Sequence, residues 1–240
     1  TGSNNTACGA KTLEANTTGS ENVGVGQSSL ADCTTGDKNI AIGTSSAANL
    51  TTGSRNTSVG NFSMGAGIVT GTNNTAVGDN SLTNLTSGTQ NVAVGAEALK
   101  ANTTADYNTA IGRSALKVNT TGEYNTAIGG LALFDSTTAS NNVAIGYIAL
   151  YENTTGTNNA AVGVQALQQN TTAGNNSALG YRALKENTTG TDNVAVGTSA
   201  LDACTTGSNN TAIGRNALGK ATTSSANTVV GSAAGDAITE

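Results

Sequence analysis

The residue types that most often carry out chemistry are scarce in this chain and form no pattern typical of a catalytic centre. The 240 residues include no His, three Cys and 15 acidic side chains. Without His, a Ser-His-Asp or Cys-His arrangement cannot form. A glycosidase would need a pair of neighbouring carboxylates, and no such pair stands out from the scattered charges. We therefore expect no enzymatic activity and assign no catalytic residue.

Metal, cofactor and nucleic-acid sites have no better support. A calcium-binding solenoid would carry Asp at one position of every repeat, whereas Asp79, Asp106 and Asp192 are isolated. We expect no metal and no cofactor. The net charge of −5 and the lack of a basic run argue against nucleic acid as a partner. No apolar stretch is long enough to span a membrane, and no binding-surface residue can be assigned.

A repeat of 17 residues must position whatever functional residues the chain has. The phrase Asn, Thr or Val, a small residue, Ile or Val, Gly recurs fourteen times, with one step of 18 residues between Gly60 and Gly78. So short a period indicates one solenoid coil per repeat. We predict a single all-β domain over residues 1–240, a parallel β-solenoid of about 14 coils. The coils start at Asn5, Asn22, Asn39, Asn56, Asn74, Asn91, Asn108, Asn125, Asn142, Asn159, Asn176, Asn193, Asn210 and Asn227.

We number each coil 1 to 17 from its first Asn, and positions 2 to 4 predict a short strand. Because strand side chains alternate, Thr109 and Ile111 share one face while Ala110 takes the other. Branched apolar residues on one side and Ala on the other indicate that both faces are covered. Gly112, at position 5, predicts a tight corner that requires a positive φ.

The second half of the coil predicts another corner. Positions 8 and 9, usually Ala-Leu, fit either a second strand or a single helical turn. Residues 119–122 (Asn-Thr-Thr-Gly) predict a corner in which Asn and Thr bond to nearby backbone and Gly supplies the unusual φ. Asn and Thr side chains are expected to form ladders between coils. The 18-residue coil, which carries Phe62 and Met64, needs a bulge or a longer corner.

The three cysteines fall at two positions of the coil. Cys8 takes a position that otherwise carries Ile, Val or Leu, so we predict that it is buried as a small apolar side chain. Cys33 and Cys204 share position 12, ten coils apart, or about 48 Å at strand spacing. A disulfide needs Cα atoms within about 7 Å, so these two cannot bond within one chain. We expect two ordinary surface residues, with intermolecular disulfides as the alternative.

Two motifs of the second corner have alternative interpretations. Asn-x-Thr sequons could be glycan acceptors, but we favour a hydrogen-bonding role for their Asn. These sequons begin at Asn16, Asn102, Asn119, Asn153, Asn170 and Asn187. The Thr-Thr pairs suggest an ice-binding face, yet adjacent threonines point in opposite directions. Thr120 and Thr121 would thus supply one outward column, and ice binding is the less favoured function.

The pattern Asn-x-Ala-(Ile/Val)-Gly-x-x-Ala, present at residues 108–115, 125–132 and 193–200, resembles the head repeat of trimeric autotransporter adhesins, the YadA-like heads. Similar repeats occur in phage tail fibres. The resemblance covers nearly the whole chain, although the coil here is longer, in its Asn-Thr-Thr-Gly corner. It implies a left-handed parallel β-roll in which three rolls pack around a common axis.

The scarcity of large side chains also favours assembly. A thin roll with two Phe, five Tyr and no Trp leaves its column of Ile and Val, or of Leu, poorly covered. We expect a homotrimer, with a self-sufficient monomer and an end-to-end filament as alternatives. The expected function is the rigid head or shaft of an extracellular fibre, adhesive toward a host-surface glycan or matrix protein. A purely structural filament is the alternative, and the expected location is the cell surface, the extracellular space or a virion fibre.

Overall fold

The computed structural model of the chain describes residues 2–65 and 67–239 and confirms the predicted parallel β-solenoid. The chain divides into two compact units, Thr1–Glu123 and Tyr124–Glu240, which we describe separately. Each coil contributes one strand of three residues, at the predicted positions 2 to 4. The described residues contain no helix. The prediction of one short strand per coil is therefore confirmed.

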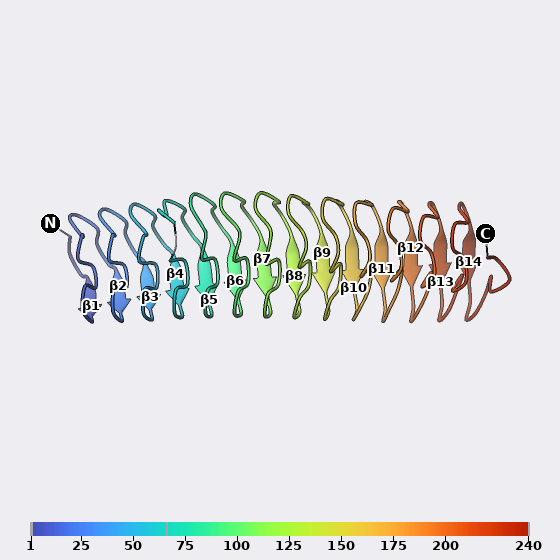
Figure 1. Ribbon diagram of the computed structural model, residues 1–240, viewed down its shortest axis with the longest axis horizontal. Coiled ribbons are helices and arrows are strands. Elements are labelled where there is room, and N and C mark those ends of the chain that lie inside the picture. The colour runs from blue at the N-terminus through green and yellow to red at the C-terminus, as the bar shows by residue number, and fades with distance from the viewer. Residues whose placement is uncertain (1, 66, 240) are drawn as a thin grey trace. The chain divides into compact units, whose positions relative to one another are not determined.

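In the first unit, seven strands pair in parallel with their sequence neighbours (Figure 1). They are β1 (Thr6–Cys8), β2 (Val23–Val25), β3 (Ile40–Ile42), β4 (Thr57–Val59), β5 (Thr75–Val77), β6 (Val92–Val94) and β7 (Thr109–Ile111). Equivalent coil positions lie opposite one another, as Ala76 lies opposite Ala93. A period matched to the coil length thus keeps the side chains of one column together.

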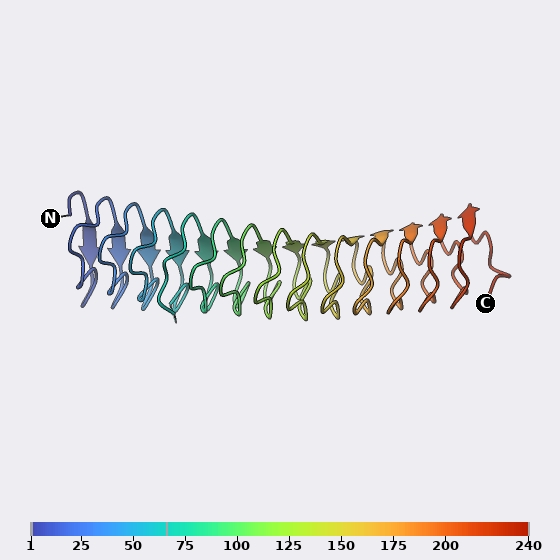
Figure 2. The same ribbon diagram turned by 90° about the horizontal axis from the view of Figure 1, so that it is seen from above.

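The second unit repeats this arrangement. Its strands are β8 (Thr126–Ile128), β9 (Val143–Ile145), β10 (Ala160–Val162), β11 (Ser177–Leu179), β12 (Val194–Val196), β13 (Thr211–Ile213) and β14 (Thr228–Val230). Ala178 lies opposite Ala195, and Ala195 opposite Ala212. Figure 2 shows the strands of this unit turning gradually from one coil to the next, as sterically favoured strand twist requires.

The core lies on the alanine side of the strands. Ala110 is fully buried, whereas Ile111 is 39% exposed. The middle residue is likewise buried in every strand from β2 to β13, but not in the end strands β1 and β14. Ala and Leu at positions 8 and 9, such as Ala200 and Leu201, fill the interior from the opposite side. The prediction that both strand faces are covered therefore holds only for the alanine face within one chain. The Ile and Val column points outward.

Positions 8 and 9 form neither a strand nor a helical turn but part of a wide turn with left-handed residues. In the coil of Asn193, Ser199 and Leu201 have φ of 54° and 52°. This conformation costs roughly 1–2 kcal/mol for a residue other than Gly. Full burial of a Leu side chain contributes about 1.5–3 kcal/mol, and the Leu201 amide donates to Ala217 O at 3.0 Å. Stacking on the next coil therefore offsets the strain.

The two corners differ in how they turn. The glycines of position 5 have φ between 126° and 139°, as predicted, and a Cβ on Gly197 would lie 2.7 Å from the carbonyl carbon of Gly214. The prediction that Gly at position 15 supplies an unusual φ is wrong. That role falls to position 17, for example Asn209 at φ 59°. Position 15 instead needs a small residue, because a Cβ on Gly88 would come within 2.5 Å of Ala105 O.

The 18-residue coil absorbs its additional residue in a longer loop before the second corner. Strand β4 stays in register, with Thr57 opposite Thr75. The chain recovers its register at Val69, which is buried and bridges to Leu50, while Ile68 before it is 69% exposed. Part of this loop, residue 66, lies outside the described residues.

Candidate binding groove

Most polar side chains of the repeat serve the coil itself. At position 1, Asn74 Nδ2 donates to Gly88 O at 2.9 Å, and its Oδ1 accepts the Asn91 amide at 3.0 Å. The predicted Asn ladder is confirmed, because Asn91 Nδ2 also reaches Asn74 Oδ1 at 3.2 Å. The threonines behave differently from the prediction. Thr188 Oγ1 donates to the backbone oxygen of Thr205 at 3.1 Å instead of to another side chain.

The asparagines of the sequons also make hydrogen bonds inside the coil. Asn187 is fully buried, and its Nδ2 donates to Gly190 O at 3.0 Å and to Asn170 Oδ1 at 2.9 Å. The nitrogen that a glycan would modify is therefore shielded in the folded coil, and the hydrogen-bonding interpretation is confirmed. In the corner that follows, Thr188 is half-buried and Thr189 exposed, which is the single outward Thr column predicted.

Both predictions about the burial of cysteines are wrong. Cys8 is exposed, because position 4 faces outward, and Cys33 and Cys204 are fully buried at position 12. Each buried Sγ lies 3.6 Å from the carbonyl that an Asn would reach, Gly36 O or Gly207 O. Burial raises the pKa of Cys33 to about 11 and also raises the pKa of Cys204. All three thiols are free.

The outward strand face is apolar and carries no charge. Positions 2 and 4 hold Thr, Val, Ile, Ala, Ser, Leu or Cys and no charged residue in any coil. At position 4, Ile145 is 37% and Leu179 51% exposed. A contiguous exposed apolar surface of this kind is typical of an interaction site.

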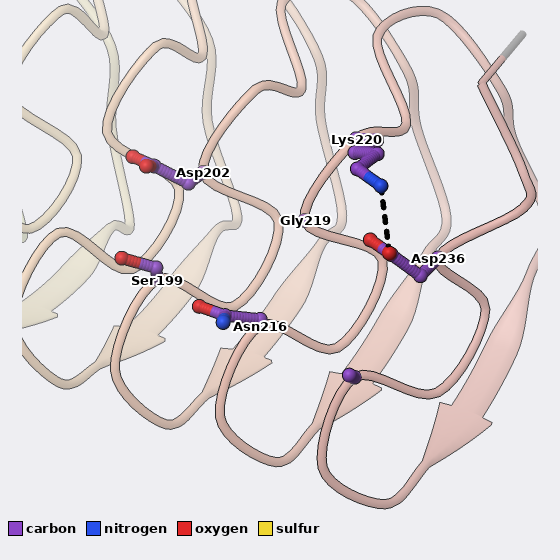
Figure 3. Close-up of a pocket in the computed structure, with 7 residues that line it drawn as sticks. Ser199, Asp202, Asn216, Gly219, Lys220 and Asp236 are labelled. Carbon is purple, nitrogen blue, oxygen red and sulfur yellow. Dashed lines mark hydrogen bonds and ion pairs between the residues drawn. The ribbon is translucent and has the colours of Figure 1, made fainter.

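A second surface runs along the side of the coil, where positions 7 and 10 of successive coils enclose two hollows in the second unit. The larger hollow, of about 290 Å³, is shown in Figure 3. The residues that line it are Ser199, Asp202, Asn216, Gly219, Lys220, Ala233 and Asp236. The smaller hollow, of about 230 Å³, is lined by Leu131, Tyr147, Ile148, Tyr151 and Gln168. We call this surface the side groove.

The larger hollow contains two carboxylates, each with a cation beside it. Lys220 Nζ lies 2.7 Å from Asp236 Oδ2 (Figure 3), and Arg182 Nη2 lies 2.9 Å from Asp202 Oδ2. Burial raises the pKa of Asp202, and the nearby Arg182 opposes that rise. Because each carboxylate has its own cation, the hollow offers ion pairs and not an acid–base couple. Sequence reasoning missed this juxtaposition, although both Asp residues occupy position 10.

The smaller hollow is aromatic and carries no ionised side chain. Tyr147 is 54% exposed, and the ring of Tyr151 stacks on that of Phe134 with centroids 5.3 Å apart and planes at 10°. Gln168 Oε1 is buried without a hydrogen-bond partner in the described chain. No residue of this hollow was assigned from the sequence. The available signal was a run of large apolar residues at positions that are polar or small in most coils.

Within residues 2–65 and 67–239, no group of three or more His, Cys, Asp or Glu side chains could hold a metal ion. The same residues form no helix with the length and apolar character needed to cross a membrane. Comparisons with protein-family models, with curated proteins and with solved structures gave no significant match.

Proposed function

We propose that this chain forms the rigid head or shaft of an extracellular fibre and assembles as a homotrimer through its outward strand face. The observation that carries the proposal is the uncharged apolar column along that face. Around a symmetry axis a residue meets copies of itself, so a charged column would repel itself whereas Ile and Val can pack. Burial of this column stabilises the assembly at about 25 cal/mol for each Å² removed from water.

The adhesive role is supported by the contrast between the interior and the side groove. Interior positions keep Asn, Ala and Leu from coil to coil, whereas positions 7 and 10 change from Glu97 and Lys100 to Leu131 and Phe134 within two coils. The fold does not dictate these side chains, so they are available to recognise a partner. Exposed side chains that differ locally on a regular frame are suited to recognise a partner.

Light scattering of the purified chain, together with electron microscopy, tests the assembly. The wild type should have the mass of a trimer. Ile145→Lys should dissociate it, because three like charges would meet in the interface, whereas Thr155→Lys, on the exposed corner of the same coil, should not. A monomeric wild type, or a trimer indifferent to Ile145→Lys, would refute the proposal. Long unbranched fibres would instead favour the purely structural filament.

A further inference from the structure

The smaller hollow of the side groove is a local departure from the repeat. The chain has only seven aromatic residues, five Tyr and two Phe, and three of them, Phe134, Tyr147 and Tyr151, lie in two consecutive coils. Tyr147 is at position 6, which is polar in many other coils, as in Thr44, Asp79 and Arg113. Position 10, which holds Phe134 and Tyr151, is Lys in the coils of Lys100 and Lys117. The solenoid therefore does not require these aromatic side chains for its own geometry.

The core gains little from Tyr147, and the neighbouring Ile148 is strained. Tyr147 is 54% exposed, and Ile148 has a φ of 51°, a conformation that is a genuine outlier for a β-branched side chain. Every described coil has a left-handed residue at position 7, and the β-branched side chain of Ile148 adds to the strain at this one. Ser, Asn or Gln fills the same position in other coils, for example Ser199 at φ 54°. A binding role accounts for a costly residue that the core does not need.

The geometry points to a neutral saccharide as the ligand, and we propose that one sugar ring binds between Tyr147 and Tyr151. This inference rests on the proposed adhesive role, whose ligand class it names. A pyranose ring has an apolar C–H face with a rim of hydroxyl groups. The faces of the Tyr rings match the apolar C–H face of the sugar, because aromatic side chains combine an apolar body with a polar tip. The stacked ring of Phe134 fixes the plane of Tyr151.

Charge and hydrogen bonding support the same ligand class. The hollow is lined by Leu131, Tyr147, Ile148, Tyr151 and Gln168, so no cation is present to select a phosphate or a carboxylate. Gln168 Oε1 has no hydrogen-bond partner in the described chain, so its amide can turn toward a hydroxyl group without breaking an existing bond. The volume of about 230 Å³ is smaller than a typical drug-sized pocket of about 300–1,000 Å³, which suits a single ring.

Tyrosine fluorescence provides the test, because the chain has no Trp and two of its five Tyr line the hollow. The probes are neutral oligosaccharides of hexoses, deoxyhexoses and N-acetylhexosamines, added to the whole chain. We expect at least one to bind, and Tyr147→Ala to weaken its affinity about tenfold, as loss of an aromatic anchor does. The matched control is Tyr181→Ala, which removes a Tyr at the same coil position with 49% exposure but outside the hollow.

The outcomes separate this inference from the fibre proposal. Binding that Tyr147→Ala weakens and Tyr181→Ala leaves unchanged supports the saccharide site. If no neutral saccharide binds, if only charged sugars bind, or if the two variants behave alike, the inference is wrong. The mass from light scattering is measured on the same samples. Trimers without saccharide binding would overturn only the saccharide site, and saccharide binding by a monomer would overturn only the trimeric fibre.

Discussion

Replacing Asn74 by Ala tests the buried column of Asn side chains in a coil that has no second Asn to take over its hydrogen bond. Asn74 is 1% exposed, and its side chain bonds to Gly88 O at 2.9 Å and to the Asn91 amide at 3.0 Å. Position 12 of this coil is Leu85 instead of Asn, so no second amide reaches the Gly88 carbonyl. The substitution leaves one buried N–H and one buried C=O without these partners.

The expected cost follows from these two groups. A buried donor or acceptor left unsatisfied costs about 1–3 kcal/mol, so Asn74→Ala should destabilise its coil by about 2–6 kcal/mol. Asn142→Ala should cost only about half as much. In that coil Asn153 Nδ2 still donates to Gly156 O at 3.0 Å, and only the Asn159 amide loses its partner. Ser87→Ala, on the exposed corner, should stay within about 0.5 kcal/mol.

Amide hydrogen exchange is the appropriate assay, because a long repeat array does not unfold in one two-state step. At about 1.4 kcal/mol for each factor of ten, the Asn91 amide should exchange at least about 30-fold faster in Asn74→Ala than in the wild type. The reasoning fails if Asn74→Ala changes exchange no more than Ser87→Ala, or if Asn142→Ala has the larger effect. Either result would mean that the Asn column does not supply the hydrogen bonds that the buried backbone N–H and C=O groups need.

Three further predictions concern the corner, a charged cluster and the thiols. Gly197→Ala should lower the thermal unfolding temperature, at a cost of about 2 kcal/mol or more, because φ is 130° and the new Cβ would lie 2.7 Å from the Gly214 carbonyl. Gly130→Ala, whose Cβ would meet only the Tyr147 ring at 3.6 Å, should leave that temperature unchanged. Hydrogen bonds from Lys100 and Lys117 lower the pKa of Glu97 to about 2 from its ordinary 4.5. The contribution of the Glu97 carboxylate to stability is therefore complete above pH 4.5 and lost as the pH falls toward 2. The urea midpoints of wild type and Glu97→Gln should differ above pH 4.5 and converge as the pH approaches 2. With a thiol reagent, the exposed Cys8 should react quickly and the buried Cys33 and Cys204 only on unfolding; rapid reaction of all three would contradict the observed burial.

The strands could be predicted from the sequence, but the inward face could not be chosen by hydrophobicity. Ile111 is more apolar than Ala110, yet the alanine is inside. The interior is narrow because Leu116 and the buried Asn108 already occupy it, so only a methyl group fits beneath the strand. The same error assigned Cys8 to the core.

The burial of position 12 could have been predicted from the sequence. Where this position is not Asn, it is Cys33, Leu50, Leu85, Ser136, Cys204 or Ala221 in complete coils of regular length. None of these side chains is charged, which is the substitution pattern of an interior column. The side groove could not be predicted from the substitution pattern. Positions 7 and 10 lie along one surface because the residues at positions 7 and 9 are left-handed, and the sequence does not reveal that backbone conformation.

These constraints divide the coil into a part that stacking fixes and a part that is free to vary. At position 1, the Asn74 side chain makes four hydrogen bonds, so nearly any substitution leaves a buried polar group without a partner. Position 7 has φ near 50–60° in every described coil, a strain that Lys11, Glu97, Leu131 and Arg182 all bear. Because that cost is similar for each of them, the choice among these side chains does not depend on the fold. A new specificity can therefore arise along the side groove without a change in the Asn and Ala columns that hold the solenoid together.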